Sequence, residues 1–559
     1  MKKWPIFLSV ILLLVAVFLR FYQLGGVPVS LYWDEMAILV DAKAIAETGQ
    51  DMHGNSMWQA IFPSYGDYKL PVYIWLASVS VKLFGVNEWA VRLPSAVAGI
   101  GTILLAVSLV KKLFPQFKDQ NWLSLAVITV IAIAPWSVMF SRTAFEGHVA
   151  QFLVLVSVWL MLKRQKWGEW SSLAALIGGL ATYTYFSVRF IWPVLLIAVT
   201  LLLIIDFKVK RSLLAYLKMI LGFLVLPLVI YLVSLKPMYS SPLYEVSNQF
   251  RLSTISVLNK ENWPVVSNQY KLLAGNNLLD KATYHPYVLI ARELAQNYAD
   301  NMSADFLFLA GDPNFRHGTG QHGLFLWIFL PSFIYGWYKF FPKYWKQGLL
   351  LLIWWVIALL PASVPETTPH ALRTLNALVP LSLVIAWGSY WLLTDLNNWQ
   401  FLKKLKLVLN LGLISLVILV VSLFADYLFK VYPAKSAASW QAGYKELAEI
   451  VAENKNQVDM IWIEPFDNVW YLWLMGYQIP VSAYQDITFN NYKPKVIDNV
   501  RLHEFDWAKI KTVEPKTIVA GKKELVDKQL SLSPVQPTWY KTITTVDGET
   551  PLAIIYFEQ

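Results

Sequence analysis

The stretch Tyr32-Trp33-Asp34-Glu35 follows an apolar segment that runs from Pro5 to Arg20. Two adjacent carboxylates therefore lie a few residues beyond the point where a membrane span would end. The apolar segment has a basic start, as a secretory signal does, but no small-residue cleavage site follows it. We interpret it as an uncleaved first span with its N-terminus in the cytoplasm, which places Asp34 and Glu35 at the outer face.

The composition indicates a polytopic membrane protein. Of 559 residues, 56% are hydrophobic and only 15% are charged, which is too apolar for an ordinary soluble protein. The net charge of +10 does not predict a nucleic-acid partner, because Lys and Arg collect in the cytoplasmic loops of membrane proteins. The chain has no cysteine, which excludes disulfides, thiolate metal sites and a cysteine nucleophile.

The apolar segments predict about eleven transmembrane helices. After the first span they cover residues 90–110, 122–140, 144–162, 171–187, 189–205, 213–235, 323–341, 347–361, 371–393 and 405–425. The segment Leu70 to Phe84 is ambiguous, because 15 residues rise only about 22 Å as a helix, against a hydrocarbon core of about 30 Å.

The basic residues decide how this short segment is placed. If Leu70 to Phe84 does not cross, every basic cluster falls in a cytoplasmic loop, and if it does cross, all of them move outside. The clusters are Lys111, Lys112 and Lys118; Lys163, Arg164 and Lys166; Lys208, Lys210 and Arg211; Lys339, Lys343 and Lys346; and Lys403, Lys404 and Lys406. We therefore predict that this segment stays on the outer surface.

This topology predicts two domains, a transmembrane module over residues 1–429 and a soluble extracytoplasmic α/β domain over residues 430–559. The module has outer loops at 25–89 and 236–322. In the first of them, Glu35 to Thr48 looks like an amphipathic interfacial helix with Gly49 as its C-cap. The C-terminal segment has a helix-like run at Ala437–Asn454 and strand-like runs at Met460–Ile463, Lys516–Ala520 and Leu552–Phe557.

Charged residues at the outer ends of spans are candidate site residues, because charge at membrane depth is expensive. Asp34 is either only an N-cap of the following helix or a group that points into a site. Neighbours on a helix do not share a face, so we favour Asp34 as the catalytic group and treat Glu35 as a second candidate or a structural neighbour. Lys69 either snorkels at a helix end or binds phosphate.

Two further pairs lie on one helix face each. Arg142 and Glu146 are four residues apart, so they could pair with each other, or Glu146 could face Asp34 while Arg142 reaches an anion. His370 and Arg373 are three apart, and such a pair suits a phosphate or diphosphate because Arg offers a planar fork of donors.

The segment Gly311 to Gly318 is dense in turn-forming residues, and such a segment is usually only a loop. His317 and His322 lie in or just after it. They are not at the helical spacing of a zinc site, so the sequence gives little support for a metal there.

Several motifs together resemble the GT-C membrane glycosyltransferases. They are Gly66-Asp67-Tyr68-Lys69-Leu70-Pro71-Val72-Tyr73, Phe84-Gly85-Val86-Asn87-Glu88-Trp89-Ala90-Val91-Arg92-Leu93-Pro94-Ser95 and Ser141-Arg142-Thr143-Ala144-Phe145-Glu146, with Asp34-Glu35 before them. The likeness is greatest to the family 39-like branch of protein O-mannosyltransferases and aminoarabinose transferases that modify lipid A. It covers roughly the first 200 residues, and His370 to Pro380 more loosely.

The resemblance implies a polyprenyl-phosphate-linked sugar donor, an acceptor hydroxyl on a lipid, glycan or protein, and a site at the outer face of the cell membrane. It implies that Asp34 is the catalytic acid or base, that Lys69 contacts the donor phosphate, and that Glu146 is the second acidic site residue. Asp67 and Arg92 enter as substrate-binding candidates through the same motifs.

The chemistry of these residues is compatible with a glycosyltransferase. Lys69, Arg142 and Arg373 could converge on the donor phosphate and stabilise it as it departs. A carboxylate that takes the acceptor proton would give a single displacement with inversion. A divalent cation held by Asp34 is compatible with this chemistry but not required, so we predict no certain cofactor.

A lipid-linked sugar transporter or flippase is the alternative, because charges within spans can form a substrate path. Transporters commonly have paired repeats and broken helices at the midplane, whereas the notable charges here lie at outer helix ends. An oligosaccharyltransferase would be expected to have a Trp-Trp-Asp-type motif in its soluble domain, and the sequence after Val431 has none.

Overall fold

The structure is a computed structural model, and it describes residues 4–163, 168–206, 213–260, 262–399, 405–464, 469–485, 496–502, 505, 507, 516–533 and 535–558. The predicted cytoplasmic residues Arg164, Lys166, Lys208, Lys210, Arg211, Lys403 and Lys404 lie outside these ranges. Contacts group the chain into two compact units. Residues 1–22 and 95–425 form the first, called here the helical unit, and residues 23–94 and 426–559 form the second, called the mixed unit.

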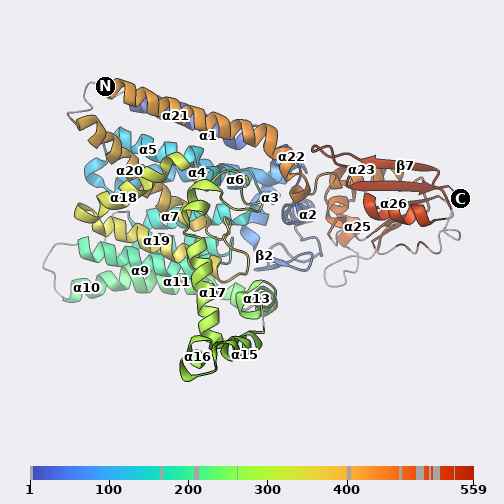
Figure 1. Cartoon of the computed structure of the whole chain (residues 1–559), viewed down its shortest axis with the longest axis horizontal. Coiled ribbons are helices and arrows are strands. Elements are labelled where there is room, and N and C mark those ends of the chain that lie inside the picture. Colours follow the sequence, from blue (N-terminus) through green and yellow to red (C-terminus); the bar gives the residue numbers. More distant parts are fainter. Residues whose placement is uncertain are drawn as a thin grey trace. The chain divides into compact units, whose positions relative to one another are not determined.

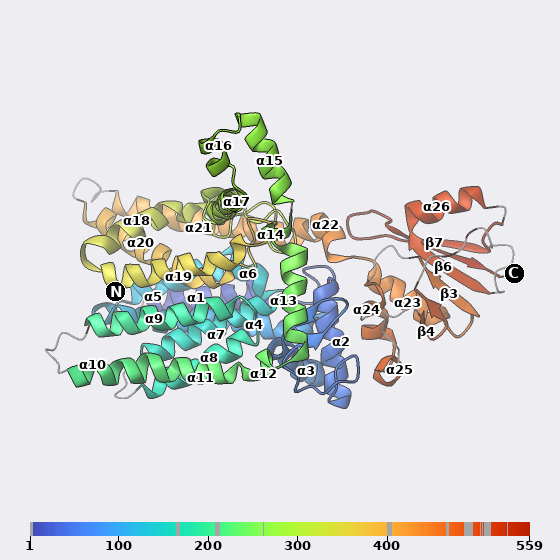
Figure 2. The same cartoon turned by 90° about the horizontal axis from the view of Figure 1, so that it is seen from below.

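Long apolar helices make up most of the helical unit (Figures 1 and 2). The helices are α1 (Trp4–Phe21), α4 (Glu88–Leu113, which starts in the mixed unit), α5 (Asn121–Ile133), α6 (Pro135–Ser141), α7 (Glu146–Met161), α8 (Glu169–Thr182), α9 (Val188–Asp206), α10 (Leu213–Ile220), α11 (Leu226–Ser234), α18 (Leu330–Lys343), α19 (Trp345–Ser363), α20 (Leu378–Asn398) and α21 (Lys406–Asp426). Neighbouring pairs such as α7 with α8 and α18 with α20 pack along their lengths.

The predicted outer loop 236–322 is mostly helical. It contains α12 (Lys236–Tyr239), α13 (Pro242–Ile255), α14 (Val257–Lys260), α15 (Trp263–Ala274), α16 (Leu278–Thr283) and α17 (Pro286–Asp300). In Figure 1, α15 and α16 lie at the end of α17 that points away from the long helices.

The described residues contain seven helices that are long and apolar enough to cross a membrane, or eight if the bent pair α5 and α6 is one span. This confirms the polytopic helical class, while the count of eleven stays a prediction. Several predicted spans have different bounds; 371–393, for example, is α-helical only from Leu378. The segment 122–140 bends by 59° where Pro135 starts α6, and 171–187 ends as a helix at Thr182. In 323–341 the α-helix begins only at Leu330, directly before a proline.

The described basic clusters gather at one end of the helical unit. The Lys112 ammonium lies 4.7 Å from the ring centroid of Trp159, near the end of α7. Gln347, at the start of α19, donates to the carbonyl of Leu113 (3.3 Å), the last residue of α4. Lys346 donates to the carbonyl of Ile205 at the end of α9 (3.4 Å). The clusters therefore share one end, as the predicted topology requires, and the side of the membrane to which this end belongs stays a prediction.

Helices α18 and α20 approach so closely that only glycine fits at the crossing. A Cβ atom on Gly388 would lie 1.8 Å from the Ser332 carbonyl oxygen, and one on Gly336 would lie 2.2 Å from that of Val384. Small residues allow such close backbone contact between helices in membranes.

We expect Gly388→Ala to destabilise the protein by about 1–3 kcal/mol or more, the usual effect of overpacking, because the added methyl group meets backbone and not a flexible side chain. Gly412→Ala on α21 is the matched control, since nothing lies within 4 Å of its Cβ position. Thermal denaturation in detergent should show a lower midpoint for Gly388→Ala alone, and equal midpoints would contradict the close crossing.

The mixed unit combines the first predicted outer loop with the C-terminal segment. The first part contains α2 (Trp33–Thr48), β1 (Phe62–Pro63), β2 (Tyr68–Lys69) and α3 (Pro71–Phe84). The second part contains α22 (Tyr432–Ser436), α23 (Tyr444–Asn454), β3 (Met460–Ile463), α24 (Tyr471–Trp473), a π-helix (Leu474–Gln478), α25 (Val481–Gln485), β4 (Val496–Ile497), β5 (Val500–Arg501), β6 (Thr517–Lys522), α26 (Lys523–Leu532), β7 (Trp539–Ile543) and β8 (Leu552–Phe557). The predicted boundary at residues 429/430 stays a prediction.

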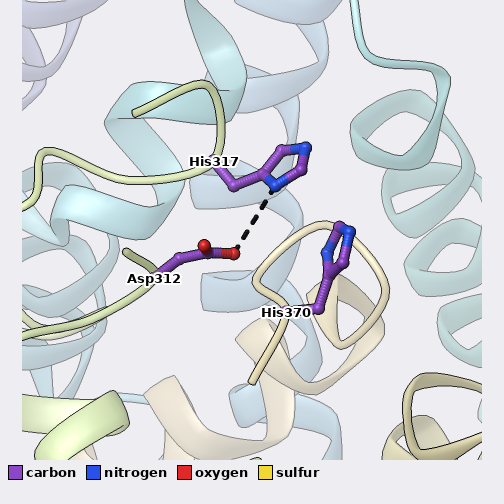
Figure 3. Close-up of side chains that lie close together, drawn as sticks. All are labelled: Asp312, His317 and His370. Atoms are coloured by element: carbon purple, nitrogen blue, oxygen red, sulfur yellow. Dashed lines mark ion pairs between the residues drawn. The ribbon is translucent and has the colours of Figure 1, made fainter. Parts of the chain in front are cut away.

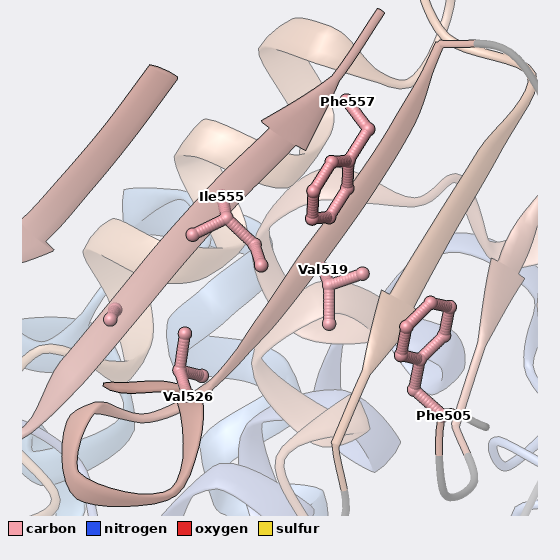
Figure 4. Close-up of a cluster of buried hydrophobic side chains, with 6 residues drawn as sticks. Phe505, Val519, Val526, Ile555 and Phe557 are labelled. Carbon is pink, nitrogen blue, oxygen red and sulfur yellow. The ribbon is translucent and has the colours of Figure 1, made fainter. Parts of the chain in front are cut away.

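A six-stranded sheet among the described residues has the order β4-β5-β3-β6-β8-β7. Strand β3 pairs in parallel with β5 and β6, and the other pairs are antiparallel. The predicted strands at Met460–Ile463 and Leu552–Phe557 are confirmed with those bounds. One face of the sheet is covered by an apolar cluster around Val519 and Ile555, to which Phe505, Val526, Ala553 and Phe557 contribute (Figure 4).

The helix predicted in the first loop is present as α2 and ends, as expected, at Gly49 in the left-handed conformation (φ 74°). The prediction that it is an amphipathic surface helix is wrong, because every residue from Glu35 to Ile45 is buried. Part of the surface of α2 is covered by residues of the C-terminal segment. The Lys43 ammonium donates to the carbonyls of Met475, Gly476 and Ile479 at 2.6–3.2 Å, at the end of the π-helix.

Candidate active site

Asp34 meets Lys69 and Tyr65 at the start of α2. The Lys69 Nζ lies 2.5 Å from Asp34 Oδ1, and the Tyr65 hydroxyl donates to the same oxygen. Lys69 is placed by β2, which pairs with β1 through Phe62. Its side chain is 4% exposed, whereas that of Asp34 is 27% exposed. Asp34 is therefore the partner that a bound molecule can reach.

The N-cap of α2 is Tyr32, without a side-chain capping bond, and Asp34 lies inside the first turn. The interpretation of Asp34 as only an N-cap is therefore wrong. Its possible metal role stays a prediction, and the Lys69 ammonium against Oδ1 opposes a second cation by repulsion.

Two opposing effects set the pKa of the Asp34 carboxyl. Burial, the largest single effect, raises it, but the Lys69 ammonium and the hydrogen bonds from Lys69, Tyr65 and Tyr32 together outweigh burial. The pKa of Asp34 therefore lies below its ordinary value of 3.8, and the group is ionised at neutral pH, as a base must be.

This lowered pKa predicts a pH-dependent stability difference between the wild type and Asp34→Asn. Because the pKa is lower in the folded protein than in the unfolded chain, ionised Asp34 stabilises the fold above pH 3.8. That contribution is lost as the pH falls through the lowered pKa. Thermal midpoints measured on acidification should converge for the two proteins, and a difference that stays constant with pH would contradict the ion pair.

Glu35 and Arg92 form a second pair, which is fully buried. Arg92 donates from Nε and Nη2 to the two Glu35 oxygens at 3.2 and 2.9 Å, and both side chains are 0% exposed. The remaining donors of Arg92 reach the carbonyls of Leu24, Pro28 and Ser30 at 2.6–3.1 Å. We therefore propose a structural role for both residues, in place of catalysis for Glu35 and substrate binding for Arg92.

The predicted residues Arg142 and Glu146 lie in the helical unit, around the turn between α6 and α7. Arg142 is 1% exposed and donates to the carbonyls of Leu19 and Tyr22, both at 2.8 Å. It thus holds the end of α1, which favours a structural role over anion binding. Glu146 is the half-buried first residue of α7. That Glu146 faces Asp34 stays a prediction, since the two residues belong to different units.

The predicted residue His370 lies beside two residues from another loop, Asp312 and His317 (Figure 3). The His317 and His370 rings are 4.3 Å apart between centroids, and His317 Nδ1 is 3.6 Å from Asp312 Oδ2. Asp312 also accepts from the backbone amides of Asn314 and Ala371, at 2.9 and 2.8 Å. All three side chains are at most 12% exposed.

Burial lowers the pKa of His370 well below its usual value, and nearby His317, Arg373 and Arg316 lower it further. His370 is therefore neutral at physiological pH, and its predicted contact with a phosphate stays a prediction. Arg373 is half-buried and donates to the hydroxyl and carbonyl of Thr367. Its proposed contact with an anion stays a prediction.

Asp67 lies in the turn between β1 and β2, where its carbonyl accepts from the Ser64 amide (2.9 Å). It is half-buried, and its contact with substrate stays a prediction. Tyr65, in the same turn, was not predicted as a site residue. The sequence offered no signal for it beyond its place two residues before Asp67.

Comparison with known proteins supports the sequence resemblance. Residues 68–234 match the family model described as dolichyl-phosphate-mannose-protein mannosyltransferase. Two relatives from Bacillus subtilis (strain 168) are putative mannosyltransferases, YycA at 28% identity over 177 residues and YkcB at 26% over 162 residues. These matches cover 31% and 28% of this chain, and only 24% and 21% of the relatives' own lengths.

Solved structures also align with the chain. ArnT from Cupriavidus metallidurans bound to undecaprenyl phosphate aligns with 98% of this chain and 97% of its own, at 13% identity and a TM-score of 0.49. The oligosaccharyltransferase AglB from Archaeoglobus fulgidus, in complex with an inhibitory peptide and a dolichol-phosphate, aligns with 100% of this chain and 74% of its own, at 12% identity and a TM-score of 0.44. The predicted resemblance to GT-C glycosyltransferases is confirmed by the family match, which includes Lys69, Arg92, Arg142 and Glu146.

Proposed function

We propose that this chain, whose residues 68–234 match the mannosyltransferase family, transfers a sugar from a polyprenyl-phosphate-linked donor to an acceptor hydroxyl at the outer membrane face. The observation that carries the proposal is the contact between Asp34 and Lys69, which places an accessible carboxylate directly beside a buried ammonium. A base and a phosphate-binding cation are the two groups that this reaction needs most.

The contact links the basicity of Asp34 to the binding of the donor phosphate by Lys69. In the ligand-free arrangement Lys69 holds the pKa of Asp34 low, and a weakly basic carboxylate is a poor proton acceptor. A donor phosphate competes with Asp34 for the Lys69 ammonium. Once Lys69 turns to the phosphate, its lowering effect weakens and the pKa of Asp34 rises. Donor binding would thus make Asp34 a better base at the moment it is needed.

The proposed reaction is a single displacement. The acceptor oxygen forms a bond to the anomeric carbon of the sugar while the bond from that carbon to the phosphate oxygen breaks. The acceptor proton passes to Asp34, and the polyprenyl phosphate leaves with its negative charge stabilised by Lys69. The configuration at the anomeric carbon is inverted. Glu146 and Arg373 are further candidates for the acceptor and phosphate sides.

The setting of the reaction follows from the predicted topology. The N-terminus is proposed to be cytoplasmic and the α/β segment 430–559 extracytoplasmic, as part of a multi-pass protein of the cell membrane. The acceptor is proposed to be a lipid, glycan or protein, and a mannosyl lipid is the first donor to test because of the family that matches.

A reconstituted assay tests the proposal directly. The purified chain is placed in proteoliposomes with a radiolabelled polyprenyl-phosphate-mannose and with lipid, glycan or peptide acceptors, and donor and free polyprenyl phosphate are separated by chromatography. We expect consumption of the donor with release of polyprenyl phosphate and label on one acceptor. If the intact donor moved across the bilayer without being consumed, the chain would be a transporter and the proposal would be wrong.

A further inference from the structure

Asp312, His317 and His370 have the composition of a metal site. Two imidazoles and a carboxylate are the protein ligands of many catalytic zinc centres, which leave the fourth position for water or another ligand. One ring nitrogen from each histidine and one carboxylate oxygen of Asp312 lie within 4.8 Å of one another. The residues come from two loops, one after α17 and one before α20 (Figure 3).

The separation of these atoms is close to what a bound ion requires. Ligand bonds of about 2.0–2.1 Å at tetrahedral angles place ligand atoms about 3.3 Å apart. His317 Nδ1 and Asp312 Oδ2 are already 3.6 Å apart, which is too long for a hydrogen bond and near the ligand spacing. Side-chain rotations of His317 and His370 would close the remaining gap.

Two ring nitrogens in this cluster have no hydrogen-bond partner. The Nδ1 atoms of His317 and His370 are both buried and unpaired, and the His370 side chain is only 9% exposed. An unsatisfied buried polar atom costs about 1–3 kcal/mol, so two of them in one cluster need an explanation. A metal ion between the rings would satisfy both lone pairs.

The loops that carry the three residues are held in place by other contacts. The His370 amide donates to Asn301 Oδ1 (3.1 Å), and the Ala371 carbonyl accepts from the Trp136 indole (3.0 Å). Asp312 itself is fixed by the Ala371 amide. Such partners hold a ligand set together before the metal arrives, as the outer contacts of known metal sites do.

Two positive side chains, Arg316 and Arg373, act on His370 electrostatically and oppose a bare cation. A three-ligand site keeps an open position, and an anion there would offset the surplus positive charge.

We propose that Asp312, His317 and His370 bind one divalent transition-metal ion, with zinc as the ion that best fits this donor set. The site ties the loop after α17 to the loop before α20. The proposal is independent of the proposed function, because a chain without transferase activity could still bind the ion.

Metal analysis of the purified full-length chain tests the site. The protein is stripped with a chelator, given Zn²⁺ and dialysed, and its zinc content is measured by mass spectrometry, with affinity from competition against a chromogenic chelator. We expect about one zinc per chain, and Co²⁺ in its place should give the visible absorption of a tetrahedral complex.

Variants locate the ion. His317→Gln and His370→Gln should each weaken zinc binding by more than about tenfold, the minimum effect seen even for outer partners of metal ligands. His322→Gln is the matched control, since its Nδ1 lies 3.0 Å from the Thr319 hydroxyl. It should bind zinc as the wild type does. Well below one zinc per chain in the wild type, or undiminished binding in both His317→Gln and His370→Gln, would overturn the proposal.

Discussion

Asp34→Asn is expected to lower the rate of sugar transfer by about 10²–10⁴-fold, the usual contribution of a general base. Asparagine keeps the size of the side chain and can still accept from Lys69 and Tyr65, but it cannot take the acceptor proton. The reduction should appear in the turnover rate at saturating donor in the proteoliposome assay.

Asp395→Asn is the control for this experiment. Asp395 has the same kinds of partner as Asp34, since it accepts from Tyr335 (2.5 Å) and pairs with Lys339 (2.7 Å), but it lies near the C-terminal end of α20. Its variant should transfer sugar at the wild-type rate. If Asp34→Asn were as active as Asp395→Asn while both were folded, Asp34 would not be the base.

Arg92→Met is expected to destabilise the protein by about 3–5 kcal/mol, because removing one partner of a buried ion pair leaves an uncompensated charge. Here Glu35 would remain at 0% exposure, and the carbonyls of Leu24, Pro28 and Ser30 would lose their donor. The free energy of unfolding, measured by denaturant titration in detergent, should fall accordingly. Arg92→Lys, which keeps the charge without the fork of donors, covers the case in which Arg92→Met does not accumulate.

Lys445→Met gives the comparison in the same unit. Lys445 pairs with Glu88 at 2.8 Å, but its side chain is 40% exposed, so the loss should be about 1 kcal/mol or less. Equal losses for Arg92→Met and Lys445→Met would mean that the buried pair contributes no more than a surface pair. The proposed structural role of Arg92 would then be wrong.

The sequence predicted the apolar helices well and their breaks poorly. Hydrophobicity over about 20 residues is a strong signal, and a helix is present in every predicted span. The bend at Pro135 and the late start of α18 depend on one residue each, and a window average does not detect them. The burial of α2 on all faces was missed because its cover comes from other elements, α3 and the residues beyond 470, which its own pattern cannot reveal.

The candidate site was predicted in part. The family resemblance assigned both Asp34 and Lys69 to the site, and the structure places the two in contact. The predicted binding role of Arg92 came from its position in a motif, which does not tell whether its donors are already occupied. The cluster of Asp312, His317 and His370 could not be predicted, since its members have no regular spacing and meet only through the packing of two loops.

The bonds of Lys43 constrain the order in which this protein can mature. Its three acceptors lie 432–436 positions later in the chain, so ribosomal synthesis completes α2 long before they exist. Until then Lys43 must stay solvated, and α2 lacks the part of its cover that residues 475–479 provide. A nascent chain that stops before residue 475 would contain every motif of the family resemblance, yet we expect it to be inactive because the acceptors of Lys43 are missing.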